Sequence, residues 1–208
     1  MTIHAVVKSI AAALLVTLVA SPALAQTEGN AQAGKGKITV CLACHGESGN
    51  DSLLPDVPKL GGQGEKYLLK QLQDIKGGVR EVQLMTGMLT NLNDQDLADI
   101  AAWYGSQEIA LGAVEAEKRQ LGEILFRAGN ADIGVAACSA CHGVDGKGLE
   151  AAGYPALSGQ DPGYIEAQLK AFRGGVRVND DSSVMRDITA RLSDTEIAAL
   201  ASYVFGVR

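Results

Sequence analysis

The chain has 208 residues, a formal net charge of −6 at pH 7 and an aromatic content of only 4%. The negative charge argues against nucleic acid or an anionic membrane face as the main partner. The length suits one large or two small domains, and domains of about 85 residues with so few aromatic side chains have difficulty building a sufficient core from their own side chains.

Residues 1–25 have the pattern of an export signal. Lys8 lies in a short n-region, an apolar run covers residues 10–20, and Ala23-Leu24-Ala25 has the small-x-small pattern of a cleavage site. The apolar run is shorter than the roughly 20 helical residues that span a bilayer, so cleavage is favoured over an uncleaved anchor. We therefore expect a mature protein that begins at Gln26, with a net charge of −7 after the loss of Lys8.

A short helix is expected at residues 31–40, directly before the first of two C-x-x-C-H motifs, at residues 41–45 and 138–142. Residues i, i+3 and i+4 of a helix share one face, so each motif can present two thiols and one imidazole to the same planar ligand. This arrangement suits covalent capture of haem, in which the thiols add to the vinyl groups and the imidazole ligates the iron. A porphyrin would also supply apolar mass that the cores lack. The predicted haem-binding residues are Cys41, Cys44, Cys138 and Cys141, and the predicted iron ligands are His45 and His142.

Three other uses of a C-x-x-C pair fit less well. A thioredoxin-like dithiol needs a strand–helix–strand setting, and no strand is predicted near either pair. A zinc site needs four soft ligands brought close together, whereas these two pairs are far apart in the sequence. A structural disulfide remains an alternative in an exported protein, although a bond between cysteines at i and i+3 of one helix would constrain the fold poorly.

Each half also contains a predicted middle helix and a predicted closing helix. The middle helices cover residues 64–76 and 162–173, carry apolar side chains at helical spacing and end at Gly-Gly pairs, which are good stop signals. The closing helices begin after Asn93 and Ser193, which are good N-cap residues followed by acidic residues. Residues 107–113 between the halves are expected to form a short, ordered linker.

The second half of the chain repeats the first. When the two C-x-x-C-H motifs are superposed, identical residues fall together at Pro58/Pro155, Leu60/Leu157, Gln63/Gln160, Tyr67/Tyr164, Gln71/Gln168 and Arg80/Arg177. A period near one hundred residues is the size of a small domain, so gene duplication is indicated. We expect two tandem all-α domains at residues 26–110 and 111–208, the second with a helix at 114–128 and extra residues at 129–136.

Methionine is the candidate for the second axial ligand, because each half has only the one histidine of its motif. Met85 and Met185 occupy matched positions before the closing helices, after a three-residue slip in the repeat. A lone methionine is usually core filler, but two at equivalent places are better explained as iron ligands. Met88 corresponds to Ile188, which cannot ligate, so Met88 is expected to pack near the haem edge.

The order of these motifs resembles a known family. C-x-x-C-H, then Pro-x-Leu-x-Gly at residues 58–62 and 155–159, then a methionine before a C-terminal helix, is similar to class I cytochrome c. The duplicated form has Gly-Gln-x-x-x-Tyr at residues 62–67, Gln-Leu pairs, and Leu-x-Asp before the last helix of each half. It closely resembles the dihaem cytochrome c4 family over essentially the whole mature chain.

The resemblance implies two covalently bound haem c groups in two class I domains related by a pseudo-twofold axis. It implies the axial pairs His45/Met85 and His142/Met185. It also implies that the carbonyl oxygens of two prolines accept the histidine Nδ1 hydrogens and fix the ring orientation; these are Pro58 and Pro155. Four further candidates either bind a haem propionate or have an ordinary role, as solvated arginines or as core tyrosines: Arg80, Arg177, Tyr67 and Tyr164.

The function implied by the resemblance is electron transfer without substrate chemistry. The family implies a periplasmic carrier, often at the membrane surface, that takes electrons from a quinol-oxidising complex or another donor and delivers them to a terminal cytochrome oxidase. An alternative is the dihaem subunit of a flavocytochrome c sulfide dehydrogenase, which drains electrons from a flavin partner. A dihaem peroxidase needs an iron with an open site, which the paired methionines argue against.

Overall fold

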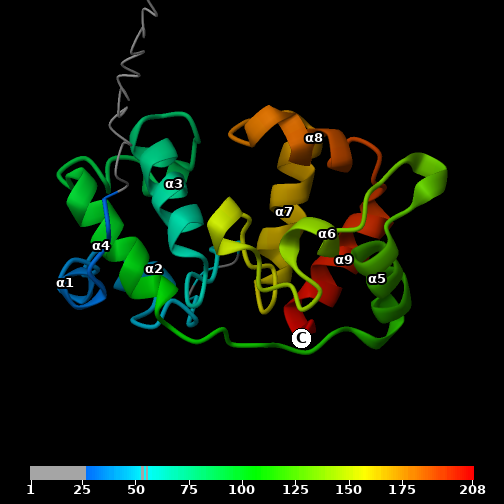
Figure 1. Ribbon diagram of the computed structural model, residues 1–208, viewed down its shortest axis with the longest axis horizontal. Helices are drawn as coiled ribbons and strands as arrows, with labels where there is room; N and C mark the ends of the chain where they lie inside the picture. The colour runs from blue at the N-terminus through cyan, green and yellow to red at the C-terminus, as the bar shows by residue number, and fades with distance from the viewer. Residues whose placement is uncertain (1–26, 53, 55) are drawn as a thin grey trace, which may run out of the picture.

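The computed structural model describes residues 27–52, 54 and 56–208, and the predicted signal at residues 1–25 lies outside them. All regular elements of the described chain are helices (Figure 1). Extended pairing in that part of the chain is limited to two isolated bridges, Asn130 with Val135 and Leu149 with Tyr154. The all-α prediction is confirmed. Among the described residues, no helix combines the length and the apolar character that crossing a bilayer requires.

The first half is organised around its closing helix, α4, which packs against α1 and α3. Leu97, Ile100 and Tyr104 of α4 are buried in this core. The elements of this half are α1 (Ala31–Lys35), α2 (Leu42–His45), α3 (Glu65–Lys76), the 3-10 helix η1 (Gln83–Met85) and α4 (Asp94–Gly105).

The second half repeats this arrangement around α9, which packs against α5 and α7. Phe126 of α5 lies against Tyr203 of α9, with ring centroids 5.5 Å apart. The α-helices of this half are α5 (Ala116–Ala128), α6 (Ser139–His142), α7 (Pro162–Arg173), α8 (Val184–Thr189) and α9 (Asp194–Gly206). Its 3-10 helices are η2 (Ala131–Ile133), η3 (Glu150–Ala152) and η4 (Asp181–Ser183).

The closing helices start where the sequence predicts. The side chain of Asn93 accepts a hydrogen bond from the backbone N–H of Asp96, and that of Ser193 accepts one from Glu196. In both helices the acidic side chain bonds back to the N-cap backbone N–H, which completes a capping box. The middle helices also match their predicted ranges, and both end at the glycine pairs.

The predicted helix at residues 31–40 is wrong in its length, since α1 ends at Lys35. Gly36 follows as the C-cap, and the chain then turns so that Lys37 reaches the carboxylates of Asp96 and Asp99 on α4. Glycine is a poor helix former, and these ion pairs favour the turn over a longer helix.

Close crossing of two helices in each half depends on a glycine. A Cβ atom added to Gly34 of α1 would lie 1.9 Å from the carbonyl oxygen of Asp99 on α4. In the second half, a Cβ atom on Gly122 of α5 would lie 2.4 Å from the carbonyl oxygen of Ala199 on α9. The two crossings are equivalent, so the duplication seen in the sequence extends to helix packing.

The two halves lie side by side, and residues 106–115 run along one edge of the molecule to join them (Figure 1). This connection bonds to both halves. Asn50 donates from Nδ2 to the carbonyl of Glu108, and Gly112 donates its N–H to the carbonyl of Phe205. The linker is therefore part of the contact between the halves.

A carboxylate buried in the contact between α1 and α4 distinguishes this contact from the matching one between α5 and α9. Asp99 is only 3% exposed and accepts hydrogen bonds from the Asn30 N–H, the Lys37 ammonium and the Gln95 amide. The Lys37 bond lowers the pKa of Asp99 below its ordinary value, against the opposing effect of burial. The matching position in α9 is Ala199, so the second half has no such carboxylate there.

Acid should therefore weaken the contact between α1 and α4 before the matching contact between α5 and α9. A carboxylate with a depressed pKa contributes stability above the ordinary carboxylate range, and that contribution is lost as the pH falls through the folded pKa. Hydrogen exchange at a series of pH values, corrected for intrinsic rates, should show α1 and α4 losing protection before α5 and α9. Asp99→Ala should remove most of this difference, and equal acid sensitivity of the two helix contacts in the unmutated protein would contradict the explanation.

Candidate haem sites

Each C-x-x-C-H motif folds into one helical turn that ends at its histidine. Cys41 precedes α2 with helical backbone angles (φ −81°, ψ −28°), and Cys138 precedes α6 in the same way (φ −60°, ψ −36°). The thiols and the imidazole of each motif therefore share one side of the turn. All four cysteines are free and partly buried.

The histidine rings are oriented by proline carbonyl groups. The Nδ1 atom of His45 lies 2.9 Å from the carbonyl oxygen of Pro58, and that of His142 lies 2.9 Å from the oxygen of Pro155. A carbonyl oxygen can only accept, so Nδ1 carries the proton and Nε2 keeps its lone pair. Burial lowers the pKa of both histidines, although the proline bonds act in the opposite direction. Each site thus offers a neutral, fixed imidazole of the kind that ligates a metal.

The first thiol of each motif does not resemble the reactive thiol of a redox dithiol. Burial raises the pKa of Cys41, and it raises the pKa of Cys138 to about 11. A reactive disulfide oxidoreductase needs a thiol with a lowered pKa. The donor set of two thiols and one neutral imidazole on one side of a turn fits a covalently attached haem in each half.

The structure places the two candidate methionines in different elements. Met85 ends η1, whereas Met185 lies in α8, and both are partly buried. The three-residue slip in the repeat falls between Arg177 and Met185, where the second half forms η4, and Ser182 and Ser183 of η4 have left-handed φ angles of 53° and 60°. This local rearrangement takes up the three-residue slip in the repeat. The role of the two methionines as iron ligands stays a prediction.

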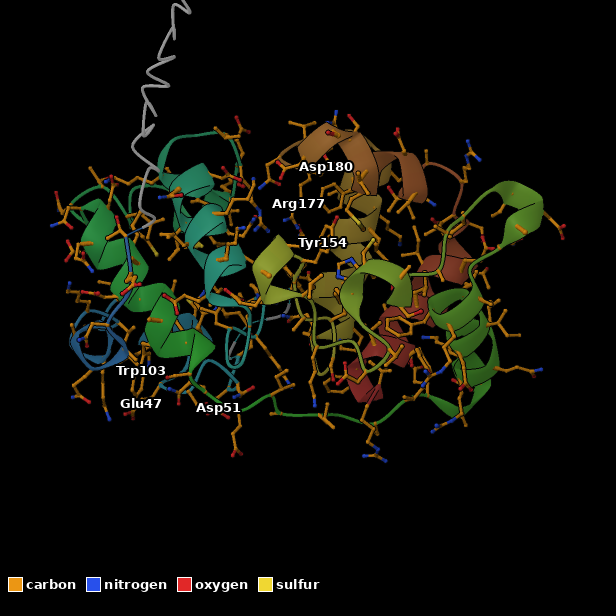
Figure 2. The ribbon with its side chains drawn as sticks, viewed as in Figure 1. Glu47, Asp51, Trp103, Tyr154, Arg177 and Asp180 are labelled. Atoms are coloured by element: carbon orange, nitrogen blue, oxygen red, sulfur yellow. The ribbon has the colours of Figure 1, made fainter. Side chains whose placement is uncertain are left out.

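The candidate arginines and tyrosines meet across the boundary between the halves. Arg80 donates from Nη2 to the hydroxyl of Tyr164, at 2.9 Å, and Arg177 donates from Nη2 to the hydroxyl of Tyr67, at 3.1 Å. Figure 2 shows Arg177 between α3 and α7. Each arginine is partly buried, so the alternative of a solvated surface arginine does not describe either of them.

Two glutamines complete this arrangement. The Oε1 atom of Gln71 accepts from Arg80 at 2.9 Å and from Arg177 at 3.0 Å, and the Oε1 atom of Gln168 accepts from the same two arginines at 3.2 and 2.9 Å. Asn179 also donates to Gln71 and accepts from Arg177. The repeat pairs the two glutamines as equivalent positions in the sequence, but it does not predict this contact between them and the arginines.

The arginine cluster carries excess positive charge. In the described part of the chain, both guanidinium groups bond only to neutral tyrosine, glutamine and asparagine side chains. Burial would raise the pKa of Tyr67, but the charges of Arg177 and Arg80 outweigh that effect and lower it. Two partly buried cations without a bonded carboxylate favour an anionic group beside them.

Two helical units, each with a proline-oriented histidine after a C-x-x-C pair, define a class of protein: tandem class I c-type cytochrome domains. The chain matches the cytochrome c family at residues 31–107 and 126–207. Cytochrome c4 of Pseudomonas aeruginosa is 51% identical over 185 residues, which cover 88% of this chain and 92% of the relative.

A solved structure and a more distant relative complete the comparison. The crystal structure of reduced recombinant cytochrome c4 from Pseudomonas stutzeri has a TM-score of 0.84 at 49% identity and covers 86% of this chain and 100% of that chain. A thiosulfate dehydrogenase electron acceptor of Thiomonas intermedia is 33% identical over 171 residues, covering 79% of this chain and 76% of the relative. The chain belongs to the cytochrome c4 family: it is an electron-transfer protein of two pseudo-twofold related cytochrome c domains with two covalently bound haem c groups.

Proposed function

We propose that this protein is a periplasmic carrier that delivers electrons to a terminal oxidase, after residues 1–25 are removed as an export signal. The two haems supply reversible one-electron chemistry when bound. The residues that we assign to them are the thioether pairs Cys41/Cys44 and Cys138/Cys141 and the axial pairs His45/Met85 and His142/Met185. The domains that carry them are residues 26–110 and 111–208.

One observation carries this assignment: the same 2.9 Å contact between a histidine Nδ1 and a proline carbonyl in both halves. Because the proton is held at Nδ1, Nε2 keeps its lone pair toward the site in both copies. A site built for proton transfer would need that proton to be mobile. Burial of both imidazoles excludes water from the contact and keeps each ring in one orientation.

The arginine cluster supports a further assignment. Arg80 and Arg177 are cationic, partly buried and bonded to neutral groups, and an arginine fork matches a carboxylate in geometry. We assign them to the propionate groups of the haems, with Tyr67 and Tyr164 as neighbours that hold the two guanidinium groups in place. Each arginine contacts the opposite half, so one cluster would serve both haems.

The donor and the acceptor are the finer part of the proposal. We expect a quinol-oxidising complex or a similar donor, a terminal cytochrome oxidase as acceptor, and peripheral association with the membrane surface. A second candidate donor is a thiosulfate-oxidising enzyme, which is favoured by the likeness to a thiosulfate dehydrogenase electron acceptor. Copurification with a flavoprotein would instead support the flavocytochrome c alternative.

The protein recovered from the periplasm should begin at Gln26 and carry two haems that acid–acetone does not extract, because each is held by two thioether bonds. After chemical reduction, it should be oxidised rapidly by membranes that contain the terminal oxidase and slowly by membranes in which that oxidase is inhibited. Mass spectrometry and stopped-flow absorbance measure the two results. Rapid reduction by thiosulfate dehydrogenase and thiosulfate, with no oxidation by the membranes, would favour the second candidate and reject delivery to the oxidase.

A further inference from the structure

Two glutamines that the arginine cluster does not use join the halves in a reciprocal way. Gln160 of the second half accepts from the N–H of Lys59 through Oε1, at 2.8 Å, and donates from Nε2 to the carbonyl of the same residue, at 2.8 Å. Gln63 of the first half makes the same two bonds to Ala156, at 2.7 and 2.9 Å. Both glutamines are only 6% exposed.

The orientation of each amide is fixed by a further bond. Oε1 of Gln63 also accepts from the N–H of Gly64, at 3.0 Å, and Oε1 of Gln160 accepts from the N–H of Asp161, at 2.9 Å. An atom that accepts from two N–H groups must be the oxygen, so the two amides cannot be flipped without breaking bonds. Each glutamine therefore presents an acceptor and a donor to the opposite half in one defined geometry.

The bonded residues directly follow the prolines that orient the histidines. The N–H of Lys59 and the C=O of Pro58 belong to one peptide group, and this carbonyl accepts the Nδ1 hydrogen of His45. The N–H of Ala156 and the C=O of Pro155 form the corresponding peptide group for His142. Gln160 and Gln63 thus reach the histidine of the half to which they do not belong, through a single peptide group.

A peptide group transmits polarisation between its two ends. When its N–H donates to an acceptor, its C=O becomes a stronger acceptor, and such cooperativity strengthens a hydrogen bond by about 10–30% in condensed phase. A stronger bond at Nδ1 makes the imidazole a more basic ligand. A more basic ligand favours the oxidised iron, so the reduction potential falls.

We propose that Gln160 and Gln63 are positioning residues that lower the reduction potential of the haem in the opposite half, each by hydrogen-bonding the peptide group that accepts the proton of that haem's axial histidine. The inference rests on the proposed function, in that His45 and His142 are the iron ligands. It makes the contact between the halves part of each haem environment. A haem in one domain therefore has its histidine tuned by the other domain.

The test uses the intact dihaem protein with Gln160→Met and Gln63→Met, which conserve side-chain volume and remove the amide. Redox titration followed by NMR resolves the two haems, and ¹⁵N-histidine labelling reports the Nδ1–H groups of His45 and His142 in the reduced protein. Each signal is assigned through nuclear Overhauser contacts to the residues beside its proline. Gln160→Met should raise the reduction potential of the first haem and move the His45 Nδ1–H signal upfield, with a smaller effect on the second haem. Gln63→Met should raise the potential of the second haem and move the His142 Nδ1–H signal upfield, with a smaller effect on the first haem.

Two further variants separate this effect from a loosened interface. Gln160→Glu keeps an oxygen acceptor for the Lys59 N–H, so the His45 proton signal should not show the upfield shift of Gln160→Met. Lys66→Met removes another bond across the same boundary, from Nζ to the carbonyl of Ala151 at 3.0 Å, without touching either proline peptide, and should leave both signals in place. The proposal is overturned if each glutamine variant affects its own half, or if Lys66→Met reproduces the glutamine effects.

Failure of this inference is distinct from failure of the proposed function. A protein without two histidine-ligated haems would lack the two haem signals before any variant is made. If only this inference is wrong, the protein has two normal haems, but each glutamine variant leaves the potential and the Nδ1–H signal of the opposite half unchanged.

Discussion

Met85→Ala should abolish the sulfur-to-iron charge-transfer band of one haem and leave that of the other. Loss of a thioether ligand should also lower the potential of the affected haem by a substantial part of the roughly 0.8 V range that axial ligands span, because methionine favours the reduced iron. Absorbance near the charge-transfer band and a redox titration measure the two effects. The second haem, assigned to Met185, serves as the internal reference.

Met88→Leu is the matched control for that change. Met88 lies three residues from Met85 and is 47% exposed, whereas Met85 is partly buried at the end of η1. The position that matches Met88 in the second half is Ile188, which cannot ligate iron. Met88→Leu should keep both bands and cost less than about 1.5 kcal/mol in stability, as volume-conserving swaps usually do. Loss of a band in this variant with both bands kept in Met85→Ala would reverse the assignment.

The double variant Arg80→Gln/Arg177→Gln should lower the potentials of both haems and slow electron exchange between them. Removing two cations that we place beside the propionates favours the oxidised, more positive irons. It also removes the hydrogen bonds from Arg80 to Tyr164 and from Arg177 to Tyr67, which hold the two halves together at this cluster. Stopped-flow oxidation should change from one rapid internal equilibration to two separable phases.

The control for the arginine variant removes an equal charge elsewhere. Lys118 lies in α5, away from the cluster; it is partly exposed, and among the described side chains its ammonium group bonds only to Glu115. Lys118→Gln combined with Arg119→Gln removes two positive charges from that helix. This control should leave both potentials and the exchange rate nearly unchanged, since exposed charges are screened by salt. A similar shift in the control and in the arginine variant would mean that net charge alone is responsible.

The arginine cluster and the two glutamine contacts have different consequences. The cluster contains charged groups that we assign to the propionates of both haems, so its removal should affect both haems together. The glutamine contacts are neutral and reach one histidine each through one peptide group, so their removal should act crosswise and separately. Measurements on the same pair of haems can therefore tell the two kinds of coupling apart.

Much of the site was predictable because it depends on short-range spacing. Two thiols and an imidazole at C-x-x-C-H fall on one side of a turn wherever that turn is helical, and α2 and α6 are such turns. The closing helices were predictable from Asn93 and Ser193, because an N-cap bond forms within three residues along the chain. The domain boundaries and the methionine ligands stay predictions.

Reliance on local sequence features also explains why the predicted length of the helix at residues 31–40 was wrong. The apolar and small residues of 31–40 are compatible with a continuous helix, but the packing of Gly34 against α4 and the reach of Lys37 to Asp99 end it early. Both contacts join residues more than sixty positions apart. Their energy is absent from any short window of the sequence.

The sequence by itself determined the two-domain organisation and the family to which the chain belongs, because these follow from motifs repeated within each half, and it predicted which residues hold a haem in each half. Only the tertiary structure decided what lies between the halves. Arg80 meets Tyr164, and Gln63 meets the peptide group beside Pro155, because two separately folded surfaces dock in one register. The repeat predicts that equivalent residues occupy equivalent places, but it does not say which of them face the other copy. Which residues lie at the contact depends on how well the two complete surfaces fit each other, and a local sequence pattern contains no information about that fit.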